Sequence, residues 1–410
     1  MANSDRFLKA AQSVADSLSA MAEPAVGGTR WETLNYAGDQ QYSTAVFGGM
    51  AGVIFLFSDL FRVTRDTKAR EVAEAAAMWV ERESKAALTT SETNPSLYSG
   101  LAGHGQMFLH LFEATGRDRW LRCAMARARA LGRAVYPDTH MLSGSSGSLV
   151  FLLRAYHATG DEALLATARA LGDDILRCAT PDATGVRWAW HLPAGRTTPH
   201  GTFFGTGFGH GASGVAYALA ELWSVTRDDA LQDAVTGTAA WIESVAIDTA
   251  YGVGWGRWPD DPHDPRVQWC HGPPGIGLFA VRAAEIFANE GFLDLALRCG
   301  QATQAAGDIR ENPSQCHGLA GNGELLIELA RVTGDDSWLA HAADFGDAAM
   351  AYQHELDGAV RWMGDEPGNY SPDFMLGSAG LGHYFLRIAR PTDVHMPLMV
   401  VAQGGWKDRQ

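Results

Sequence analysis

The stretch GLAGNGELLIELARV, from Gly318 to Val332, places a Gly-x-x-Gly step in front of an apolar segment. This segment is longer and more continuously apolar than a sheet strand usually is, so we expect a helix that is buried on most sides. Similar units occur throughout the 410 residues, starting at Gly49, Gly100, Gly144, Gly211, Gly272 and Gly377. The sequence therefore predicts a sevenfold repeat.

Most of the apolar segments end in a turn with an aspartate that is suited to cap a following helix. These residues are Asp66, Asp118, Asp161, Asp228 and Asp335. A more amphipathic segment follows, so each unit is predicted to be a helix pair. A closed ring of inner and outer helices is favoured over an open solenoid, because neither end unit has a polar cap.

We therefore expect an all-α fold with a single domain over residues 1–410. Residues 1–44 would form an N-terminal helix and lead-in, and residues 45–410 the seven helix pairs. All Gly-x-x-Gly turns would gather at one end of the ring, where helix N-termini favour anions. Three insertions at this end are predicted hairpins. Their residues Trp188, Trp255 and Trp362 would form an aromatic rim around a cleft or pack the loops onto the ring.

The composition limits the classes of partner. The net charge of −15 argues against general affinity for nucleic acid or anionic membranes, since both require clustered basic residues. Charges at Asp5, Arg6, Lys9 and Asp16 interrupt the N-terminal apolar residues, so we expect neither an export signal nor stable membrane insertion. A cytoplasmic location with reduced cysteines is the resulting expectation.

Two of the five cysteines stand in a repeated Cys-His-Gly phrase. Cys270 and His271 precede the fifth Gly-x-x-Gly step, Cys316 and His317 precede the sixth, and His210 precedes the fourth. Because the turns converge, these side chains should be neighbours in space. Two thiols with one or two imidazoles suit Zn²⁺, and three protein ligands would leave a fourth position open. The alternative is a pair of structural cysteines, as we expect for Cys123, Cys178 and Cys299, which are predicted to be small buried side chains.

Four motifs, GHGASG (209–214), RVQWCHGPPGIG (266–277), CHGLAGNGE (316–324) and FMLGSAGLGHYFLRIARP (374–391), resemble the lanthionine synthetase C-like (LanC) family of lanthipeptide cyclases. The resemblance extends over nearly the whole chain. It implies an α/α toroid of seven inner and seven outer helices, and one Zn²⁺ held by Cys270, Cys316 and His317.

The resemblance also implies roles for residues around the metal. His210 matches the proposed acid/base histidine of the family, Arg266 matches its active-site arginine, and His271 is a site residue rather than a ligand. The alternatives are a packed histidine at 210 and a simple ion pair between Arg266 and Asp264.

One position departs from the family pattern. His140 stands four residues before the third step, where the family commonly has an aspartate proposed for acid/base work. As a neutral imidazole, His140 would be a catalytic residue that accepts the thiol proton, but it offers no carboxylate. Either Asp138 or Asp373 would then supply the missing carboxylate, or zinc alone would deprotonate the thiol. An altered or slow activity is a further alternative.

In the family, a cysteine thiolate attacks the β-carbon of a dehydroalanine or dehydrobutyrine in the same peptide and closes a thioether ring. Negative charge then develops at the α-carbon and its carbonyl, so the site needs a cation and a proton source. Arg266 would be the cation, and His210 or His271 the proton donor. The expected partner is a dehydrated precursor peptide. A separate dehydratase, or a kinase and lyase, must act on it first, because no such module fits beside seven repeats.

Three other functions compete with a cyclase. The chain would add glutathione to dehydroamino acids, or it would be a non-catalytic, zinc-containing scaffold that binds a peptide, which His140 mildly favours. A helical-ring glycosidase needs two carboxylates across a cleft. The motif turns carry cysteine and histidine instead, which makes the glycosidase the weakest of the three.

Overall fold

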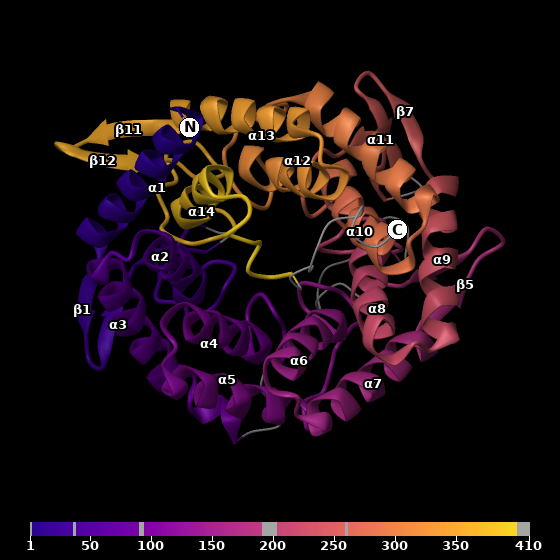
Figure 1. Cartoon of the computed structure of the whole chain (residues 1–410), viewed down its shortest axis with the longest axis horizontal. Coiled ribbons are helices and arrows are strands. Elements are labelled where there is room, and N and C mark those ends of the chain that lie inside the picture. Colours follow the sequence, from indigo (N-terminus) through magenta and orange to yellow (C-terminus); the bar gives the residue numbers. More distant parts are fainter. Residues whose placement is uncertain (1, 36–37, 90–93, 191–202, 259–260, 400–410) are drawn as a thin grey trace.

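The computed structural model describes residues 2–35, 38–89, 94–190, 203–258 and 261–399. Within these residues, fourteen α-helices form a closed two-layered ring (Figure 1). Each inner helix packs on the next, and the last packs on the first. The inner helices are α2 (Met50–Thr64), α4 (Leu101–Thr115), α6 (Ser145–Thr159), α8 (Ala212–Thr226), α10 (Pro273–Phe287), α12 (Leu319–Thr333) and α14 (Ser378–Ala389). The predicted all-α toroid is confirmed.

Six outer helices each pack on the inner helix that precedes them. They are α3 (Thr67–Ser84), α5 (Asp118–Leu131), α7 (Glu162–Arg177), α9 (Asp229–Ser244), α11 (Glu290–Ala306) and α13 (Asp336–Ala349). The seventh is α1 (Ala2–Met21), which packs on α14. The sequence predicted that residues 1–44 would precede seven complete helix pairs. Instead, α1 is the outer partner of α14, because its residues Phe7 and Val14 are fully buried and cover this last inner helix. The first and last helices of the ring thus form one pair.

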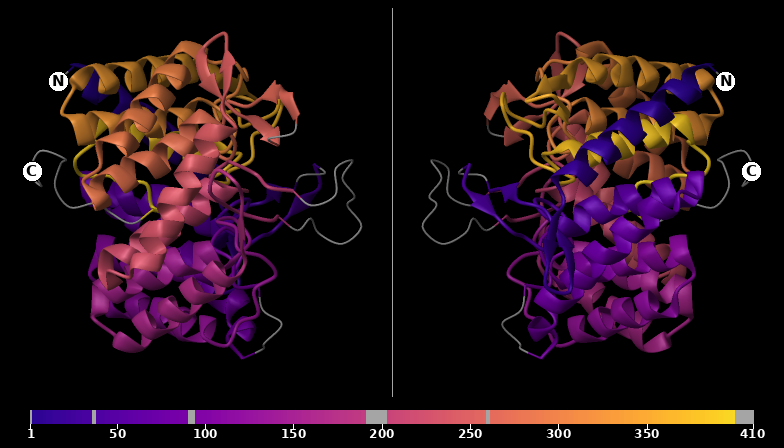
Figure 2. Two further views of the ribbon diagram at one scale, coloured as in Figure 1. Left: turned by 90° about the vertical axis from the view of Figure 1, so that its right-hand side faces the viewer. Right: turned by 90° about the vertical axis from the view of Figure 1, so that its left-hand side faces the viewer.

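The Gly-x-x-Gly steps let each connecting loop pack directly on the first turn of its inner helix. A Cβ atom added at Gly321 would lie 1.8 Å from the carbonyl oxygen of Gln315. One added at Gly275 would lie 2.0 Å from that of Trp269. Glycine is therefore required by close approach of two backbones. In the side views, the strands and loops gather at one end of the ring (Figure 2).

Caps at the outer helices follow the predicted turns with one exception. The side chains of Asp66, Asp161, Asp228 and Asp335 each accept a hydrogen bond from the backbone N–H two residues later. The expectation for Asp118 is wrong, because it is the first residue of α5 and Arg117 stands at the cap without a side-chain bond. The turn is as long as the other four, and Arg117 occupies the position that the aspartate has in them.

The loops carry six small antiparallel hairpins among the described residues. They are β1 (Glu23–Ala25) with β2 (Gly28–Arg30), β3 (Thr33–Leu34) with β4 (Gln40–Gln41), β5 (Ala179–Pro181) with β6 (Val186–Trp188), β7 (Ile247–Thr249) with β8 (Gly252–Gly254), β9 (Gly256–Trp258) with β10 (Asp261–Pro265), and β11 (Gln353–Leu356) with β12 (Ala359–Trp362). Short 3₁₀ turns occur at η1 (Ala86–Leu88) and η2 (Met350–Tyr352). Hairpins are therefore present in all three predicted insertions; residues 191–202 of the first and 259–260 of the second lie outside the described residues.

The tryptophans of these insertions pack the hairpins onto the ring. Trp188, Trp255 and Trp362 are at most 2% exposed. The indole N–H of Trp188 donates to the carbonyl oxygen of Ile175 in α7, and Trp255 makes the same bond to a carbonyl of α9. Trp362 packs against Phe385 of the inner helix α14. The packing interpretation of these three residues is therefore correct, and they do not form an aromatic rim.

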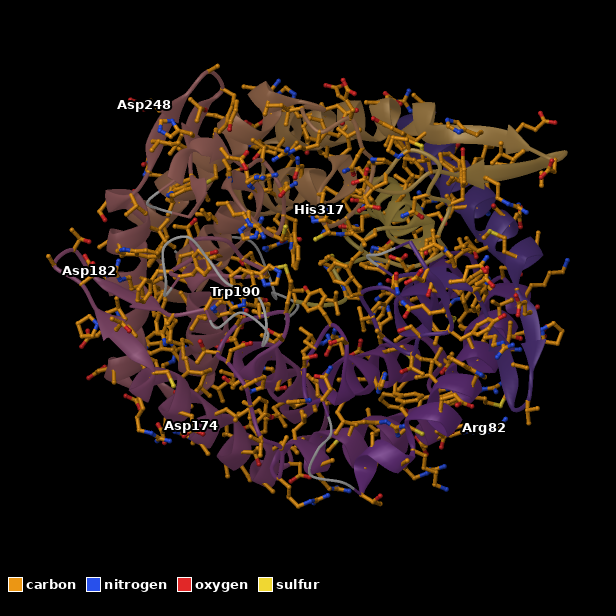
Figure 3. The ribbon with its side chains drawn as sticks, turned by 180° about the vertical axis from the view of Figure 1, so that it is seen from behind. Arg82, Asp174, Asp182, Trp190, Asp248 and His317 are labelled. Atoms are coloured by element: carbon orange, nitrogen blue, oxygen red, sulfur yellow. The ribbon has the colours of Figure 1, made fainter. Side chains whose placement is uncertain are left out.

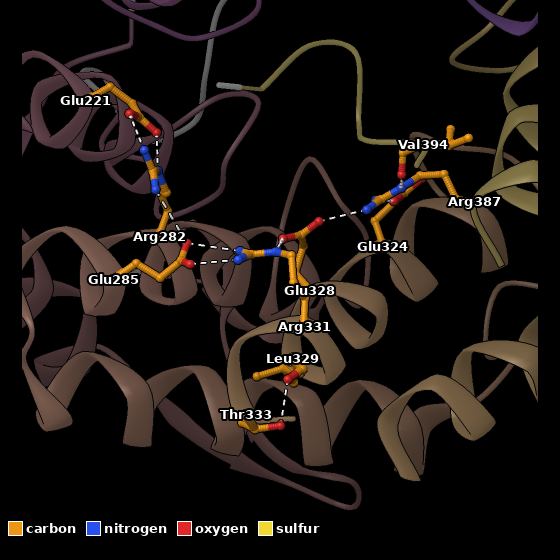
Figure 4. Close-up of polar contacts among 10 residues, drawn as sticks. All are labelled: Glu221, Arg282, Glu285, Glu324, Glu328, Leu329, Arg331, Thr333, Arg387 and Val394. Carbon is orange, nitrogen blue, oxygen red and sulfur yellow. Dashed lines mark hydrogen bonds and ion pairs between the residues drawn. The ribbon is translucent and has the colours of Figure 1, made fainter. Parts of the chain in front are cut away.

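Buried ion pairs join neighbouring inner helices (Figure 4). Arg282 of α10 contacts Glu221 of α8 at 2.5 Å. Arg331 of α12 contacts Glu285 of α10 at 2.7 Å, and Arg387 of α14 contacts Glu328 of α12 at 2.7 Å. Because charges buried in this way are stable only when paired, each pair fixes how two adjacent helices are aligned.

The ring is closed by a fully buried carboxylate. Asp59 of α2 lies 2.9 Å from Nε2 of His383 in α14 and 3.0 Å from Nε2 of His110 in α4. Arg62 lies 2.9 Å from the same side chain. Burial raises the pKa of Asp59, but His110, His383 and Arg62 outweigh it and hold that pKa far below its usual range. The carboxylate is therefore ionised and bridges three inner helices.

The ion pair of Glu328 predicts a dependence of stability on pH. Burial raises the pKa of Glu328, but Arg331 and Arg387 outweigh it and lower this pKa from 4.5 to about 2. Because the folded-state pKa lies below the unfolded value, the pair stabilises the fold above about pH 4.5, and this stabilisation is lost as the pH falls towards 2. In Glu328→Gln, the free energy of unfolding should therefore fall less steeply over this range than in the wild type.

Urea unfolding at several pH values measures this slope. The matched control is Glu71→Gln on α3, whose side chain is exposed and should leave the wild-type slope unchanged. Equal slopes for Glu328→Gln and the wild type would contradict the assigned ion pair.

Candidate metal centre

The two Cys-His-Gly phrases meet at the end of the ring where the inner helices begin. The ligand atoms of Cys270, Cys316 and His317 all lie within 4.8 Å of one another. Backbone bonds between units hold this geometry: Cys316 donates its N–H to the carbonyl oxygen of Met375 at 2.8 Å, and the Cys270 carbonyl accepts from the N–H of Gly209 at 3.2 Å. Turns of units four to seven therefore form one rigid floor.

The environment of the two thiols separates their pKa values. The pKa of Cys270 lies well below its usual range, because its sulfur accepts a hydrogen bond from the Cys316 thiol and faces His317. Burial, together with that same contact, raises the pKa of Cys316. Burial lowers the pKa of His317, but Asp365 and Cys270 outweigh it and raise that pKa to about 9. One thiolate is thus already favoured by the protein alone.

This set of donors fits a zinc ion. Sulfur with imidazole is the donor set that Zn²⁺ prefers, and three such atoms within 4.8 Å of one another are close enough to surround one ion after small side-chain rotations. The cysteines are 3% and 2% exposed, whereas the His317 side chain is 27% exposed. Protein therefore covers the two sulfur atoms, whereas solvent reaches the site on the side of His317, as an open catalytic position requires.

A row of aromatic rings lies beside the thiols. The ring centroids of His210 and His271 are 5.6 Å apart, and Trp190 stacks on the other face of His210 at 4.7 Å. His140 follows at 5.8 Å from Trp190. The backbone N–H of Trp190 donates to the carbonyl oxygen of Phe203, which holds the indole in place. The structure thus brings together all three histidines singled out by sequence.

Burial controls the charge of two of these rings. It lowers the pKa of His210 to about 3, with further lowering from His271. It also lowers the pKa of His271 to about 3, with contributions from Arg257 and the metal-ligand candidate His317. Both imidazoles are therefore neutral near pH 7, and each has a nitrogen that can accept a proton.

Arg266 forms the ion pair with Asp264 that was its alternative interpretation, and its role in the active site stays a prediction. Its guanidinium pairs with Asp264, and its positive charge also helps to lower the pKa of His271. The side chain is 24% exposed, and its backbone N–H donates to the carbonyl oxygen of Trp255. The arginine is thus anchored on the β9–β10 hairpin close to the histidine row.

Asp138 and Asp373, which were considered as substitutes for a carboxylate at position 140, form hydrogen bonds within their own turns. Asp138 accepts the backbone N–H of His140 at 2.8 Å and the hydroxyl of Ser143 at 2.7 Å. Asp373 accepts the hydroxyl of Ser371 and the backbone N–H groups at the start of α14. Burial raises the pKa of Asp373 to about 6. Both residues shape loops.

Two residues at the site escaped the sequence analysis. Trp190, two residues after the packed Trp188, covers His210, and Asp365 faces His317. Figure 3 shows Trp190 and His317 towards the middle of the ring, while Arg82, Asp174, Asp182 and Asp248 lie at its periphery. The doubled tryptophan in WAWH was the available signal for Trp190. Conversely, Cys178 was expected to be buried and is exposed, because it stands at the C-cap of α7.

Comparison with known proteins identifies the family. The model of the family described as lanthionine synthetase C-like protein matches residues 40–401. The chain belongs to the lanthionine synthetase C-like family. None of the described helices of this LanC-family chain combines the length and apolar character needed to cross a bilayer.

Three known proteins are similar to this LanC-family chain. Glutathione S-transferase LANCL1 of Danio rerio is 29% identical over 146 residues, which are 36% of this chain and 35% of that protein. LanC-like protein GCL1 of Arabidopsis thaliana is 29% identical over 140 residues, 33% and 30% of the respective chains. The chain thus spans about a third of the length of the curated relatives it matches. The structure of nisin cyclase superposes with a TM-score of 0.67 at 15% identity, covering 86% of this chain and 90% of nisin cyclase, and supports the fold.

Proposed function

We propose that this LanC-family chain is a zinc-dependent cyclase that adds cysteine thiolates of a dehydrated precursor peptide to dehydroalanine or dehydrobutyrine. The observation that carries the proposal is the convergence of Cys270, Cys316 and His317 within 4.8 Å. When bound, Zn²⁺ would lower the pKa of an incoming thiol and favour its thiolate. The relation to nisin cyclase supports a peptide substrate.

The chain's own residues would handle the charge and proton of the addition. The substrate sulfur bonds to the β-carbon, the π electrons move to the α-carbon and its carbonyl, and the α-carbon takes up a proton. The neutral imidazole of His210 accepts the thiol proton and returns it to the α-carbon. Arg266 stabilises the negative carbonyl oxygen. The product is a lanthionine or methyllanthionine ring, with no proton gained or lost overall.

A second candidate is glutathione addition to dehydroamino acids. It is favoured by the relative named glutathione S-transferase. In both reactions the protein would work in a reducing compartment such as the cytoplasm, since the thiols must be free. A separate dehydratase, or a kinase and lyase, would supply the alkene. The third candidate is a zinc-containing peptide-binding scaffold.

One experiment separates these functions. The metal content of the pure protein is measured, and a dehydrated cysteine-containing peptide is incubated with and without glutathione, followed by mass spectrometry and thiol alkylation. Loss of free thiol without a mass change supports the cyclase. A glutathione adduct supports the second candidate. One zinc per chain with neither reaction would support the scaffold, and absence of zinc would contradict all three.

A change at His210 tests its role as the proton carrier. We expect His210→Ala to lower turnover about 10²–10⁴-fold, the usual contribution of general acid–base catalysis, with zinc content unchanged. His341→Ala is the matched control, because that histidine lies on the outer helix α13 and is 37% exposed. Wild-type turnover in His210→Ala would show that another group carries the proton.

A further inference from the structure

Asp365 lies over the metal centre although it belongs to another unit of the ring. It comes from the insertion before α14, whereas His317 precedes α12. Its Oδ2 atom is 3.7 Å from Nδ1 of His317, and its side chain is 10% exposed. A nearly buried carboxylate beside one ring nitrogen of a metal-ligand candidate has a specific electrostatic effect on that imidazole, because little water screens it.

A continuous polar chain holds this carboxylate in place. The side-chain amide of Asn369 donates to Oδ1 of Asp365 at 3.0 Å, and the Asn369 oxygen accepts the N–H of Ser371 at 2.9 Å. The hydroxyl of Ser371 donates to Asp373 at 2.5 Å, and Asp373 accepts the N–H of Gly377 at 3.1 Å. Asp365 is therefore anchored to the first turn of α14.

The backbone restricts Asp365 further. Its N–H donates to the carbonyl oxygen of Leu376 at 2.8 Å, and the N–H of Gly364 donates to that of Asn369 at 2.7 Å. The turn from 364 to 369 is thus closed on itself and tied to α14. With its backbone and one carboxylate oxygen fixed, the second oxygen faces His317 without a large choice of rotamers.

We propose that Asp365 is a positioning residue that orients His317 and strengthens its hold on Zn²⁺. This inference rests on the metal centre of the proposed function. A carboxylate that faces one ring nitrogen favours the tautomer with its proton on that nitrogen, limits the rotation of the ring and makes the other nitrogen a stronger ligand. Unit seven thereby contributes to metal binding by unit six without supplying a ligand.

The test is the zinc affinity of full-length Asp365→Asn, measured by competition with a chromophoric chelator after the protein has been stripped of metal. We expect the dissociation constant for Zn²⁺ to rise about 10–100-fold, the usual effect of losing such a partner. Asn369→Ala should give a smaller rise, because it removes one tether and keeps the charge. Glu366→Gln is the matched control: it removes the same charge from the adjacent exposed residue and should leave the affinity unchanged.

Thermal unfolding with and without Zn²⁺ separates positioning from folding. Asp365→Asn should unfold like the wild type in chelator and gain less stability from zinc. An unchanged zinc affinity in Asp365→Asn, or an equal loss of stability with and without zinc, would overturn this inference and leave the metal centre intact. Failure of the wild type to bind one zinc would overturn the proposed metal centre and, with it, this role of Asp365.

Discussion

Replacing Cys316 with alanine is expected to abolish stoichiometric zinc binding and to lower the turnover of thiol addition at least about 100-fold, since even an outer partner of a metal ligand contributes 10–100-fold. The substitution removes one of two thiols from a floor in which both are almost fully buried. The substitution leaves only two ligands, Cys270 and His317, and the one group of metal-ligand side chains found among the described residues is the set that includes Cys316.

Metal content per chain and turnover on a dehydrated peptide measure this effect in parallel. Cys178→Ala is the control, because Cys178 is an exposed cysteine at the end of α7. It should keep both the zinc and the rate. A Cys316→Ala protein with one zinc and wild-type turnover would show that the proposed centre is wrong.

Replacing Asp59 with alanine is expected to lower the free energy of unfolding by about 3–5 kcal/mol, the usual result of removing one partner of a buried ion pair. Three groups lose the carboxylate that they contact, namely His110, His383 and Arg62. The first two belong to helices on either side of α2. The substitution therefore destabilises the contact between the first and last inner helices, α2 and α14.

Denaturant unfolding followed by circular dichroism tests this expectation. Asp248→Ala on the exposed β7 strand removes the same side chain without a buried partner and should change stability by less than about 0.5 kcal/mol. If the midpoints of the two variants coincide, Asp59 does not hold the ring closed.

The inner layer and the convergence of Cys270 with Cys316 could be predicted because both follow from the repeat. Gly318 and its six counterparts mark the helix starts, and equivalent positions in a ring must converge. Cys270 and Cys316 occupy nearly such equivalent positions, so their meeting followed from the topology. The side chain of His317 was assigned through the resemblance to the LanC family, since the residues alone left His271 equally eligible.

The rest depends on packing that no repeat encodes. Strict strand alternation would put Trp188 and Trp190, two residues apart, on the same face. The strand β6 ends at Trp188, so Trp190 lies outside it and stacks on His210, which the sequence pattern does not show. Asp365 lies in an insertion without a counterpart near unit six. The pairing of α1 with α14 could not be predicted either. An amphipathic pattern shows which face of a helix is buried, but it does not show which other helix covers that face.

The pairing of α1 with α14 has a consequence for synthesis on the ribosome. Roughly 360 residues lie between Met21 and Ser378, so the partner of α1 emerges about 20–70 s later at 5–20 residues per second. During that time the apolar stripe around Phe7 and Val14 has no native partner. Six units can stack as an open arc, and the ring becomes complete only when its last helix returns to its first. Burial of this stripe of α1 is therefore one of the last steps of folding during synthesis.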